Sequence, residues 1–461
     1  MGLTVFVLLA VSEIALAIWT CTKGRESSRQ RKVRLFVRVG QLAVVAIALL
    51  LPAGQKWRFA PVLCFLALLL VIAVVVALAK RSKVDKPRKP AGAIVSCVAC
   101  VLALGVLMVP AFVFTGYAGL PTTGEYQVTE TSAILIDESR TDPFEQDGSA
   151  REVPVHFYYP AATEGHAGEF PLVVFSHGAF GYYQSNTSTY MELASNGYVV
   201  AALDHPHHAF FTTDTDGRTV LVDQGFLNTA LEISSQDTAK LDPLEQLTIY
   251  QDWMALRTAD MEFVLDELER AGQSGALDSS WFVVDGNDGR ILNVLGTVDF
   301  SKIGLMGHSM GGATSVQLGR QRDDVTAVVD LDGTMLGEYT GVADGHLIVN
   351  EGRYMVPVLE FMNWENYNEL AQGMDEFRAQ GGVYANDELM RNATDGYSTT
   401  VRDTLHMDFT DLPLLSPTLG KMLGSGERDC EETMTIVNSV VLDFFNCYLK
   451  GQGAFSVQEV Y

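Results

Sequence analysis

The sequence predicts an α/β fold, with a mostly parallel central sheet and helices on both faces, preceded by four transmembrane helices. Three observations lead to this expectation. The composition of the 461-residue chain changes near residue 120, from apolar and basic to acidic. After that point, short apolar runs typical of buried strands alternate with runs at helical spacing. One of them ends in a glycine-flanked serine at 307–311, where a strand leads directly into a helix.

Four apolar runs before residue 120 are long enough to cross a bilayer. They span roughly 3–21, 39–54, 59–79 and 91–116, against about 20 residues needed per helix. A cleaved signal peptide would account for the first run alone, and that run lacks a basic start. We therefore expect residues 1–119 to form a four-helix membrane anchor.

The charge distribution predicts which side of the membrane each part faces. Basic residues cluster at 23–38 and at 80–89, in the first and third connections between the runs. Such clusters stay on the cytoplasmic side, so everything after Tyr117 is expected outside the plasma membrane. Residues 1–120 hold 15 basic and 3 acidic side chains, which leaves 17 basic and 53 acidic ones in 121–461, a net charge of −36. A part so acidic is not expected to bind nucleic acid.

The four helices are expected to anchor the protein in the membrane. Glu13 and Arg38 are the ionisable residues within the runs, whereas transport pathways usually need several such groups. The alternative, a transport or lipid-binding channel, stays open.

Residues 120–130, rich in Gly, Pro and Thr, are expected to be a linker, and 131–461 a second domain. Strand, helix and strand in sequence favour a parallel sheet with crossover helices. The expected strands are 133–136, 153–159, 171–175, 198–203, 325–329 and 356–362, with helices at 190–195 and about 431–449.

The acidic segment 205–250 interrupts this alternation, and we expect a cap-like insertion over a functional site. Its histidines, 205, 207 and 208, lack acidic neighbours at metal-ligand spacing, so they are expected at the surface and without a metal ion. In the helix that follows, Arg257 and Asp260 are expected to form a surface ion pair.

The turn at 307–311 is typical of a nucleophile elbow, the strand-to-helix turn that carries the reactive serine of α/β-hydrolases. It would hold Ser309 at strained backbone angles and expose its hydroxyl. Gly307 and Gly311 fit there because side chains would collide across so tight a turn. The N–H of Met310, at the helix start, would face an oxyanion formed beside the serine. The alternative is a glycine-rich turn with an incidental serine.

Two histidines follow Ser309, and either could take the proton of its hydroxyl. In this fold the order along the chain is serine, acid, histidine. His406 is expected to be the base because it lies late, before the final helix, whereas His346 adjoins an apolar run.

The acid that orients the histidine has three candidates. Asp332 closes the first strand after the elbow, and Asp330 lies two residues earlier on the same strand end. Glu365 follows the second strand, from which many hydrolases of this fold take their acid. Asp332 leads on its position, and the residues alone leave the choice open.

Four stretches of the chain resemble the plasma-type platelet-activating factor acetylhydrolases. They are 175–178, 193–202, 307–313 and the pair Leu331-Asp332. That family has the α/β-hydrolase fold, needs no calcium and cleaves short or oxidised sn-2 acyl chains from phospholipids. The resemblance covers roughly 125–450 and leaves out the four apolar runs and the segment 205–250.

The resemblance implies roles for individual residues. It makes Asp332 the acid, because the family carries it in a Leu-Asp pair at this offset from the serine, 332 − 309 = 23. It makes His406 the base, in a His-x-x-Phe context that Phe409 completes. It also implies that the second N–H of the oxyanion hole belongs to Ala179.

Together these features predict a membrane-anchored, outward-facing serine esterase that acts on lipid or small esters without a metal or cofactor. Short-chain phospholipids are the expected substrates. One alternative is a general carboxylesterase on soluble esters. Another, from a different class, is a non-catalytic membrane sensing or binding protein with a hydrolase fold.

Overall fold

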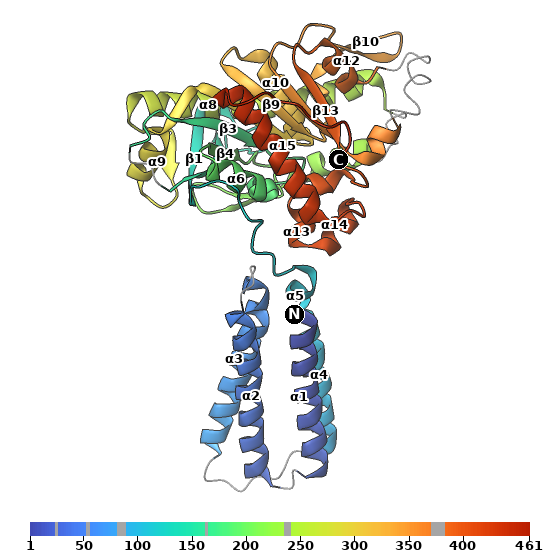
Figure 1. Ribbon diagram of the computed structural model, residues 1–461. Helices are drawn as coiled ribbons and strands as arrows, with labels where there is room; N and C mark the ends of the chain where they lie inside the picture. The colour runs from blue at the N-terminus through green and yellow to red at the C-terminus, as the bar shows by residue number, and fades with distance from the viewer. Residues whose placement is uncertain (24–25, 52–55, 81–88, 162–164, 235–240, 370–382) are drawn as a thin grey trace. The chain divides into compact units, whose positions relative to one another are not determined.

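The computed structural model describes residues 1–461 except 24–25, 52–55, 81–88, 162–164, 235–240 and 370–382 (Figure 1). The chain forms two compact units. The first comprises Met1–Gly119 and Leu412–Met422, and the second comprises Leu120–Asp411 and Leu423–Tyr461. The division lies close to the change in composition, but a short segment from late in the chain joins the first unit.

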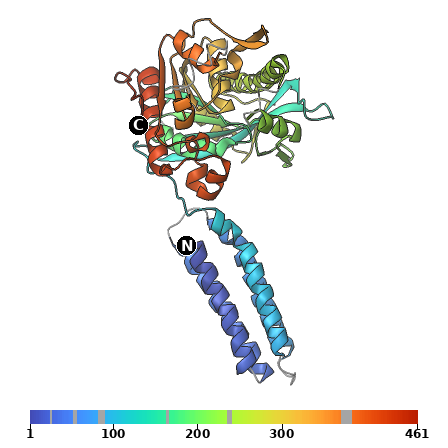
Figure 2. The same ribbon diagram turned by 90° about the vertical axis from the view of Figure 1, so that its right-hand side faces the viewer.

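The first unit is built from long apolar helices that run along one another (Figures 1 and 2). They are α1 (Gly2–Thr22), α2 (Ser27–Leu50), α3 (Ala60–Ala79) and α4 (Pro90–Leu107), with η1 (Lys56–Phe59) before α3 and α5 (Val109–Val113) after α4. All four long helices, α3 taken together with η1, have the length and hydropathy of membrane spans. Helix α2 begins well before the expected 39, because hydropathy marks the apolar part of a helix and the Arg, Lys and Gln residues of 27–38 are themselves good helix formers.

Inside this unit, apolar side chains from all four helices pack together. The buried members include Leu9, Val45, Val62, Leu66 and Leu104. Large apolar side chains on the other faces stay exposed, as for helices surrounded by lipid; they include Leu3, Ile14, Ile47, Val71 and Leu102.

The late segment of the first unit contains α13 (Leu412–Leu415) and most of α14 (Pro417–Leu423). It is hydrogen bonded to the residues that follow α5. The N–H and hydroxyl of Thr115 donate to the carbonyls of Leu415 and Leu414, both at 2.8 Å. The hydroxyl of Ser416 donates to the carbonyl of Val113 at 2.7 Å.

The second unit is organised around a nine-stranded sheet in the order β13-β12-β9-β8-β3-β4-β2-β1-β7. The strands from β13 to β4 pair in parallel, and β2, β1 and β7 pair antiparallel. Their bounds are β1 Val128–Thr141, β2 Ala150–Pro160, β3 Phe170–Ser176, β4 Val199–Leu203, β7 Trp281–Val283, β8 Val298–His308, β9 Val325–Leu331, β12 Val358–Met362 and β13 Gly396–Thr400. The mostly parallel central sheet is therefore confirmed.

Helices cover both faces of this sheet. On β8, Ile303 and Leu305 pack into the core cluster with residues of α8 (Pro243–Ser274) and α10 (Met310–Gln321). Gly304, between them, faces α15 (Cys430–Lys450), where a Cβ would lie 2.7 Å from the ring of Phe445. Successive strand residues point to opposite faces, so α15 lies across the sheet from α8 and α10, and α6 (Thr187–Ser195) packs beside it. The expected final helix is confirmed, one residue longer at each end.

Smaller elements connect these parts at the ends of the strands. They are η2 (Tyr183–Asn186), α9 (Asp288–Leu295), η4 (Leu336–Glu338), β10 (Tyr339–Ala343), β11 (His346–Val349), α12 (Ala385–Asn392) and η5 (His406–Phe409).

Two segments differ from their expectation. Residues 123–126 of the expected linker are bound to α6, with the N–H of Thr123 on Glu192 Oε2 at 2.9 Å and the N–H of Tyr126 on the carbonyl of Ser195 at 3.0 Å. The expected insertion 205–250 contains a hairpin, β5 (Phe211–Thr213) and β6 (Thr219–Leu221), and helix α7 (Gln224–Ser234). Its last residues, from 243, already belong to α8, where Leu247 and Tyr250 are buried in the core.

Candidate active site

Ser309 occupies the turn between β8 and α10 with φ 55° and ψ −125°. Residues other than glycine rarely adopt such angles. A Cβ at Gly307 would lie 2.1 Å from the carbonyl carbon of Gly311, and one at Gly311 would lie 1.9 Å from the carbonyl oxygen of Ser176. Only glycine fits at either position, so the turn brings the start of α10 against the end of β3.

Asp332 and His406 are brought together from segments 74 residues apart. Asp332 follows β9 with φ 56°, and its Oδ2 lies 2.6 Å from Nδ1 of His406. The Asp332 side chain is 3% exposed and that of His406 is 43% exposed. Because a carboxylate accepts hydrogen bonds, the proton lies on Nδ1 and leaves the Nε2 lone pair of His406 available.

Asn363, at the end of β12, is a part of the site that the sequence reasoning missed. Its N–H donates to Asp332 Oδ1 at 2.7 Å, and its side-chain amide donates to Oδ1 and Oδ2 at 3.1 and 2.9 Å. These donors fix the orientation of the Asp332 carboxylate. The available signal was its position, since Asn363 is the first residue after the strand that often carries the acid in this fold.

His406 lies in η5, whose C-terminal end is fixed by two contacts. Phe409 is fully buried and its ring packs 5.9 Å from that of Phe361 in β12. Asp411, just beyond η5, accepts the N–H and the hydroxyl of Ser188 in α6, both at 2.6 Å. Burial raises the pKa of Asp411 to about 7.

His308, immediately before the serine, links the elbow to His406. Its Nε2–H donates to the carbonyl of His406 at 3.1 Å, and the two rings lie 4.6 Å apart. Burial, followed by the nearby His406, holds the pKa of His308 well below its ordinary value, so this ring stays neutral. Among the described residues, no hydrogen bond joins Ser309 to His406, a common state of such pairs without substrate.

Two backbone N–H groups beside Ser309 have no backbone acceptor among the described residues. Met310 is the first residue of α10, where the N–H cannot bond within the helix. Ala179 follows Gly178, and a Cβ at Gly178 would lie 3.2 Å from Cβ of Ser309. The loop after β3 therefore adjoins the elbow, and both N–H groups are available to an anion there.

Arg257 is not the surface residue that the sequence suggested. It is fully buried in α8, and its guanidinium donates to the carbonyls of His177 and Gly178. A trans peptide places its N–H opposite its carbonyl, so the bond to the Gly178 carbonyl turns the N–H of Ala179 away from α8. Burial lowers the pKa of Arg257 to about 9, and it remains a cation near neutral pH.

Asp260 is likewise buried and pairs with other residues instead of Arg257. Its carboxylate binds Arg151 at 2.8 and 3.1 Å and accepts a hydrogen bond from Nδ1 of His205 at 2.9 Å. Burial alone would raise the pKa of Asp260, but Arg151 and His205 hold it below its ordinary value. Nε2 of His205 then accepts the hydroxyl of Ser176, at the end of β3, at 2.8 Å.

Of the histidines after β4 that were expected at the surface, His205 and His208 are not there, whereas His207 is partly exposed. His205 and His208 are buried, and His208 stacks on Phe226 of α7 at 3.7 Å. Burial lowers the pKa of His205 to about 4, so it is neutral. Within the described ranges, no group of three or more His, Cys, Asp or Glu side chains is arranged to hold a metal ion.

The rival candidates lie elsewhere. His346 is exposed on the β10–β11 hairpin, and Glu365 is exposed after β12. Asp330 is fully buried below the elbow, where one oxygen accepts the N–H of Gly333 at 2.9 Å. Burial and the carboxylate of Glu360 raise the pKa of Asp330 well above its ordinary value. A neutral, buried acid cannot stabilise a charged histidine.

Comparisons with known proteins agree with this architecture. A family model described as "Platelet-activating factor acetylhydrolase, isoform II" matches residues 148–458. Two proteins named platelet-activating factor acetylhydrolase, from Cavia porcellus and Gallus gallus, are each 23% identical and cover 65% and 61% of this chain. The chain spans only 61% and 62% of their lengths.

A solved ferulic acid esterase from Streptomyces cinnamoneus matches with a TM-score of 0.51 and 22% identity, over 73% of this chain and 94% of that chain. This likeness, together with the mostly parallel sheet, shows the α/β-hydrolase fold.

The role of Arg257 in orienting the loop after β3 gives a test. Replacing Arg257 with Lys keeps the positive charge but loses the fork that binds two carbonyls. We expect kcat on p-nitrophenyl acetate to fall by about tenfold to a hundredfold, somewhat less than the loss of a complete oxyanion donor. KM should change little, because the donor acts on the transition state.

Arg140→Met is the matched control. Arg140 belongs to the neighbouring charged network, where it binds Asp260 at 3.0 Å, and no bond from Arg140 to the loop after β3 is described. Its loss should leave kcat near the wild-type value. Equal losses of kcat in the two variants, or a fall in Tm that matches the fall in kcat, would show that Arg257 only supports the fold.

Proposed function

The chain belongs to the platelet-activating factor acetylhydrolase, isoform II, family, and from that premise we propose that it is a serine ester hydrolase held at a membrane. Ser309 is the nucleophile, His406 the general base and Asp332 the acid that orients it. The N–H groups of Ala179 and Met310 form the oxyanion hole. The observation that carries this proposal is the 2.6 Å hydrogen bond between Asp332 and His406, beside a serine with strained backbone angles.

The proposed reaction follows from these positions. The hydroxyl oxygen of Ser309 attacks the ester carbonyl while Nε2 of His406 takes its proton. The negative charge on the carbonyl oxygen is stabilised by the N–H groups of Met310 and Ala179. The tetrahedral intermediate then expels the alcohol, which takes the proton from His406. Water, deprotonated by the same nitrogen, cleaves the acyl-enzyme and releases the carboxylic acid.

Substitution of the nucleophile and the base tests this assignment. Ser309→Ala is expected to abolish labelling by a fluorophosphonate probe and to lower ester hydrolysis by roughly 10⁴-fold or more. His406→Ala should behave in the same way. Neither should lower the Tm of the full chain much, because Ser309 makes no side-chain hydrogen bond among the described residues and the His406 ring is 43% exposed.

His346→Ala is the matched histidine control, since His346 is exposed on the β10–β11 hairpin. It should keep full labelling and turnover. If folded wild-type protein takes up no probe at all, the non-catalytic sensing protein is the better description. If Ser309→Ala keeps substantial activity, the nucleophile lies elsewhere.

The membrane part of the proposal rests on length, hydropathy and charge. Helices α1 to α4 could each span a bilayer, and the basic residues of 23–38 and 80–89 support a cytoplasmic position for those connections. We propose an integral, multi-pass plasma-membrane protein whose second unit is extracytoplasmic. Its net charge of about −36 would not draw it to anionic headgroups, so the helices provide the attachment.

The orientation can be measured with inserted epitopes. A tag between Asp216 and Gly217, exposed at the tip of the β5–β6 hairpin, is expected to bind antibody on intact cells. A tag within 81–88 should bind only after permeabilisation. The reverse pattern would place the second unit in the cytoplasm.

The substrate is proposed from the names of the relatives, from the proposed membrane attachment and from the charge of the second unit. A tethered enzyme meets lipid esters at high local concentration, and the relatives are named for platelet-activating factor. The negative field of the second unit disfavours anionic small molecules during approach. We therefore propose neutral or zwitterionic short-chain esters, foremost phospholipids with short sn-2 acyl groups. A general carboxylesterase on soluble esters is the second candidate, which the esterase-like fold allows.

An acyl-chain series decides between these two substrate classes. On matched phosphatidylcholines, we expect acetyl to butyryl sn-2 groups to be released faster than long ones, with Ser309→Ala as the blank. The same series on p-nitrophenyl esters measures intrinsic chain preference without a lipid. If soluble esters turn over well and the phospholipids are untouched, the lipid assignment fails and the carboxylesterase remains.

A further inference from the structure

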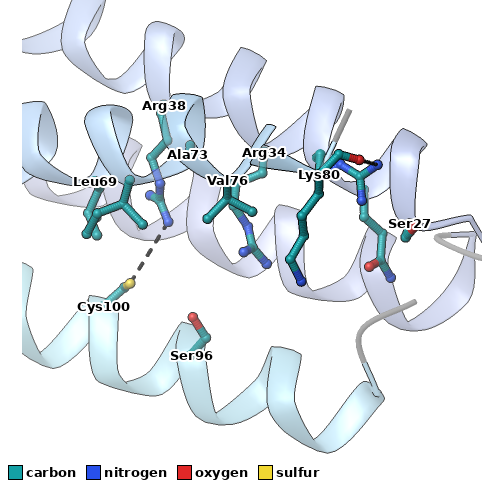
Figure 3. A pocket seen from close by; sticks show the side chains of 12 residues that line it. Ser27, Arg34, Arg38, Leu69, Ala73, Val76, Lys80, Ser96 and Cys100 are labelled. Carbon is teal, nitrogen blue, oxygen red and sulfur yellow. Dashed lines mark hydrogen bonds between the residues drawn. The ribbon is translucent and has the colours of Figure 1, made fainter. Parts of the chain in front are cut away.

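Buried polar side chains of the first unit bind one another across helices. Arg38 of α2 pairs with Glu13 of α1, and its Nη2 lies 4.0 Å from Sγ of Cys100 in α4, inside the cavity of about 430 Å³ that Figure 3 shows. Gln41, one turn further along α2, donates to Glu13 at 2.8 Å. Each of these bonds connects two helices, so this network holds the helices against one another.

In the second unit, one buried side chain binds the backbone turn that carries the proposed acid. Asn386 lies near the start of α12 and is 1% exposed. Its Nδ2 donates to the carbonyl of Gly333 at 2.7 Å, and its Oδ1 accepts the N–H of Met335 at 2.9 Å. Both bonds therefore hold the backbone that directly follows Asp332.

The same amide also donates to a buried carboxyl group. Nδ2 of Asn386 lies 2.6 Å from Oε1 of Glu360 in β12, and Oε2 of Glu360 accepts the hydroxyl of Ser398 in β13 at 2.8 Å. Both donors and the acceptor of the amide are thus used. A carboxylate at this position would lack the donors for Glu360 and for the carbonyl of Gly333.

The turn that Asn386 binds is strained and packs against the elbow. Asp332 has φ 56°, which residues other than glycine rarely adopt. A Cβ at Gly333 would lie 2.4 Å from the carbonyl oxygen of Ser309, and the N–H of Ser309 donates to the carbonyl of Leu331 at 2.9 Å. Strained angles persist only where surrounding bonds fix them, and Asn386 supplies two such bonds.

Helix α12 is itself fixed to the core of the second unit. Ala385 and Leu389, on either side of Asn386, are fully buried in the core cluster. The carbonyl of Asn392, the last residue of the helix, accepts the N–H of Tyr354 at 3.1 Å. The helix can therefore hold the Asn386 amide in one place.

We propose that Asn386 is a positioning residue for the reaction assigned to Ser309. Its two backbone bonds keep the turn in the conformation that brings Oδ2 of Asp332 to 2.6 Å from Nδ1 of His406. Asn363 orients the carboxylate of Asp332, whereas Asn386 fixes the backbone that carries it. This inference rests on the proposed function, and its test separates the two.

Asn386→Ala in the full-length chain tests the proposal. The kcat on p-nitrophenyl acetate is referred to the number of sites that take up a fluorophosphonate probe, so unfolded molecules are not counted. We expect kcat per site to fall by about tenfold to a hundredfold, the effect of moving a reacting group by about 1 Å. KM should change little. A merely structural role would lower the number of sites and leave kcat per site unchanged, which would overturn the proposal.

A double-mutant cycle shows whether Asn386 acts through Asp332. Asp332→Asn alone should lower kcat by about 10⁴-fold, as the loss of the acid does in such triads. In that background, Asn386→Ala should add less than about a threefold loss, because groups that act as a unit are not additive. The same tenfold to hundredfold loss in both backgrounds would overturn the proposal.

Asn386→Asp keeps the side-chain volume and the acceptor for Met335, so it serves in both measurements if Asn386→Ala does not fold. Its expected loss of kcat per site has the same direction, because the carbonyl of Gly333 loses its donor.

Asn392→Ala is the matched control. Asn392 lies on the same helix, is partly exposed, and its amide donates to Glu388 at 2.8 Å. It should keep kcat per site, and a loss equal to that of Asn386→Ala would assign the effect to the helix as a whole. If the wild-type chain takes up no probe, the proposed function fails and this inference with it. If the wild type is active and Asn386→Ala equals it, only this inference fails.

Discussion

The close approach of two backbone segments at the end of β8 determines the arrangement around Ser309. With no Cβ at Gly311, the start of α10 lies against the carbonyl of Ser176, where any side chain would overlap it. This contact brings the loop after β3 beside the serine and turns the serine out of the sheet. The N–H groups of Ala179 and Met310 then adjoin Ser309, as the proposed acyl transfer would require.

Buried charge then holds the loops that the backbone contact brings together. Arg257 binds two carbonyls of the loop after β3, and Asp260 binds Arg151 and His205 beneath it. Since removal of one partner would leave a charge buried without compensation, such groups tolerate few alternative arrangements. The first unit also contains buried charges, but there Arg38 and Glu13 neutralise one another directly among apolar helices. In both units the charged groups specify position more than they add stability.

The features predicted from sequence are those with a local signal. Apolar length identified the helices of the first unit, and the glycine pattern with its preceding strand located the elbow. Arg257 and Asp260 were misjudged because opposite charges three residues apart on a helix are usually solvated. Met254 and Met261, on the same face of α8 as Arg257, were the available sign of burial. Asn363 carried no such sign, since its role depends on two strand ends that only the folded sheet brings together.

The hydrogen bonds between Asn363 and Asp332 suggest how the acidic residue that orients the histidine could be supplied by a different strand of this fold. The two residues follow adjacent parallel strands, β9 and β12; Asp332 binds the imidazole of His406, and Asn363 binds Asp332. Exchanging a carboxylate for an amide at the two positions would transfer the acid from one strand to the next while the histidine stays in place. The intermediate with two carboxylates would have to share a proton between them.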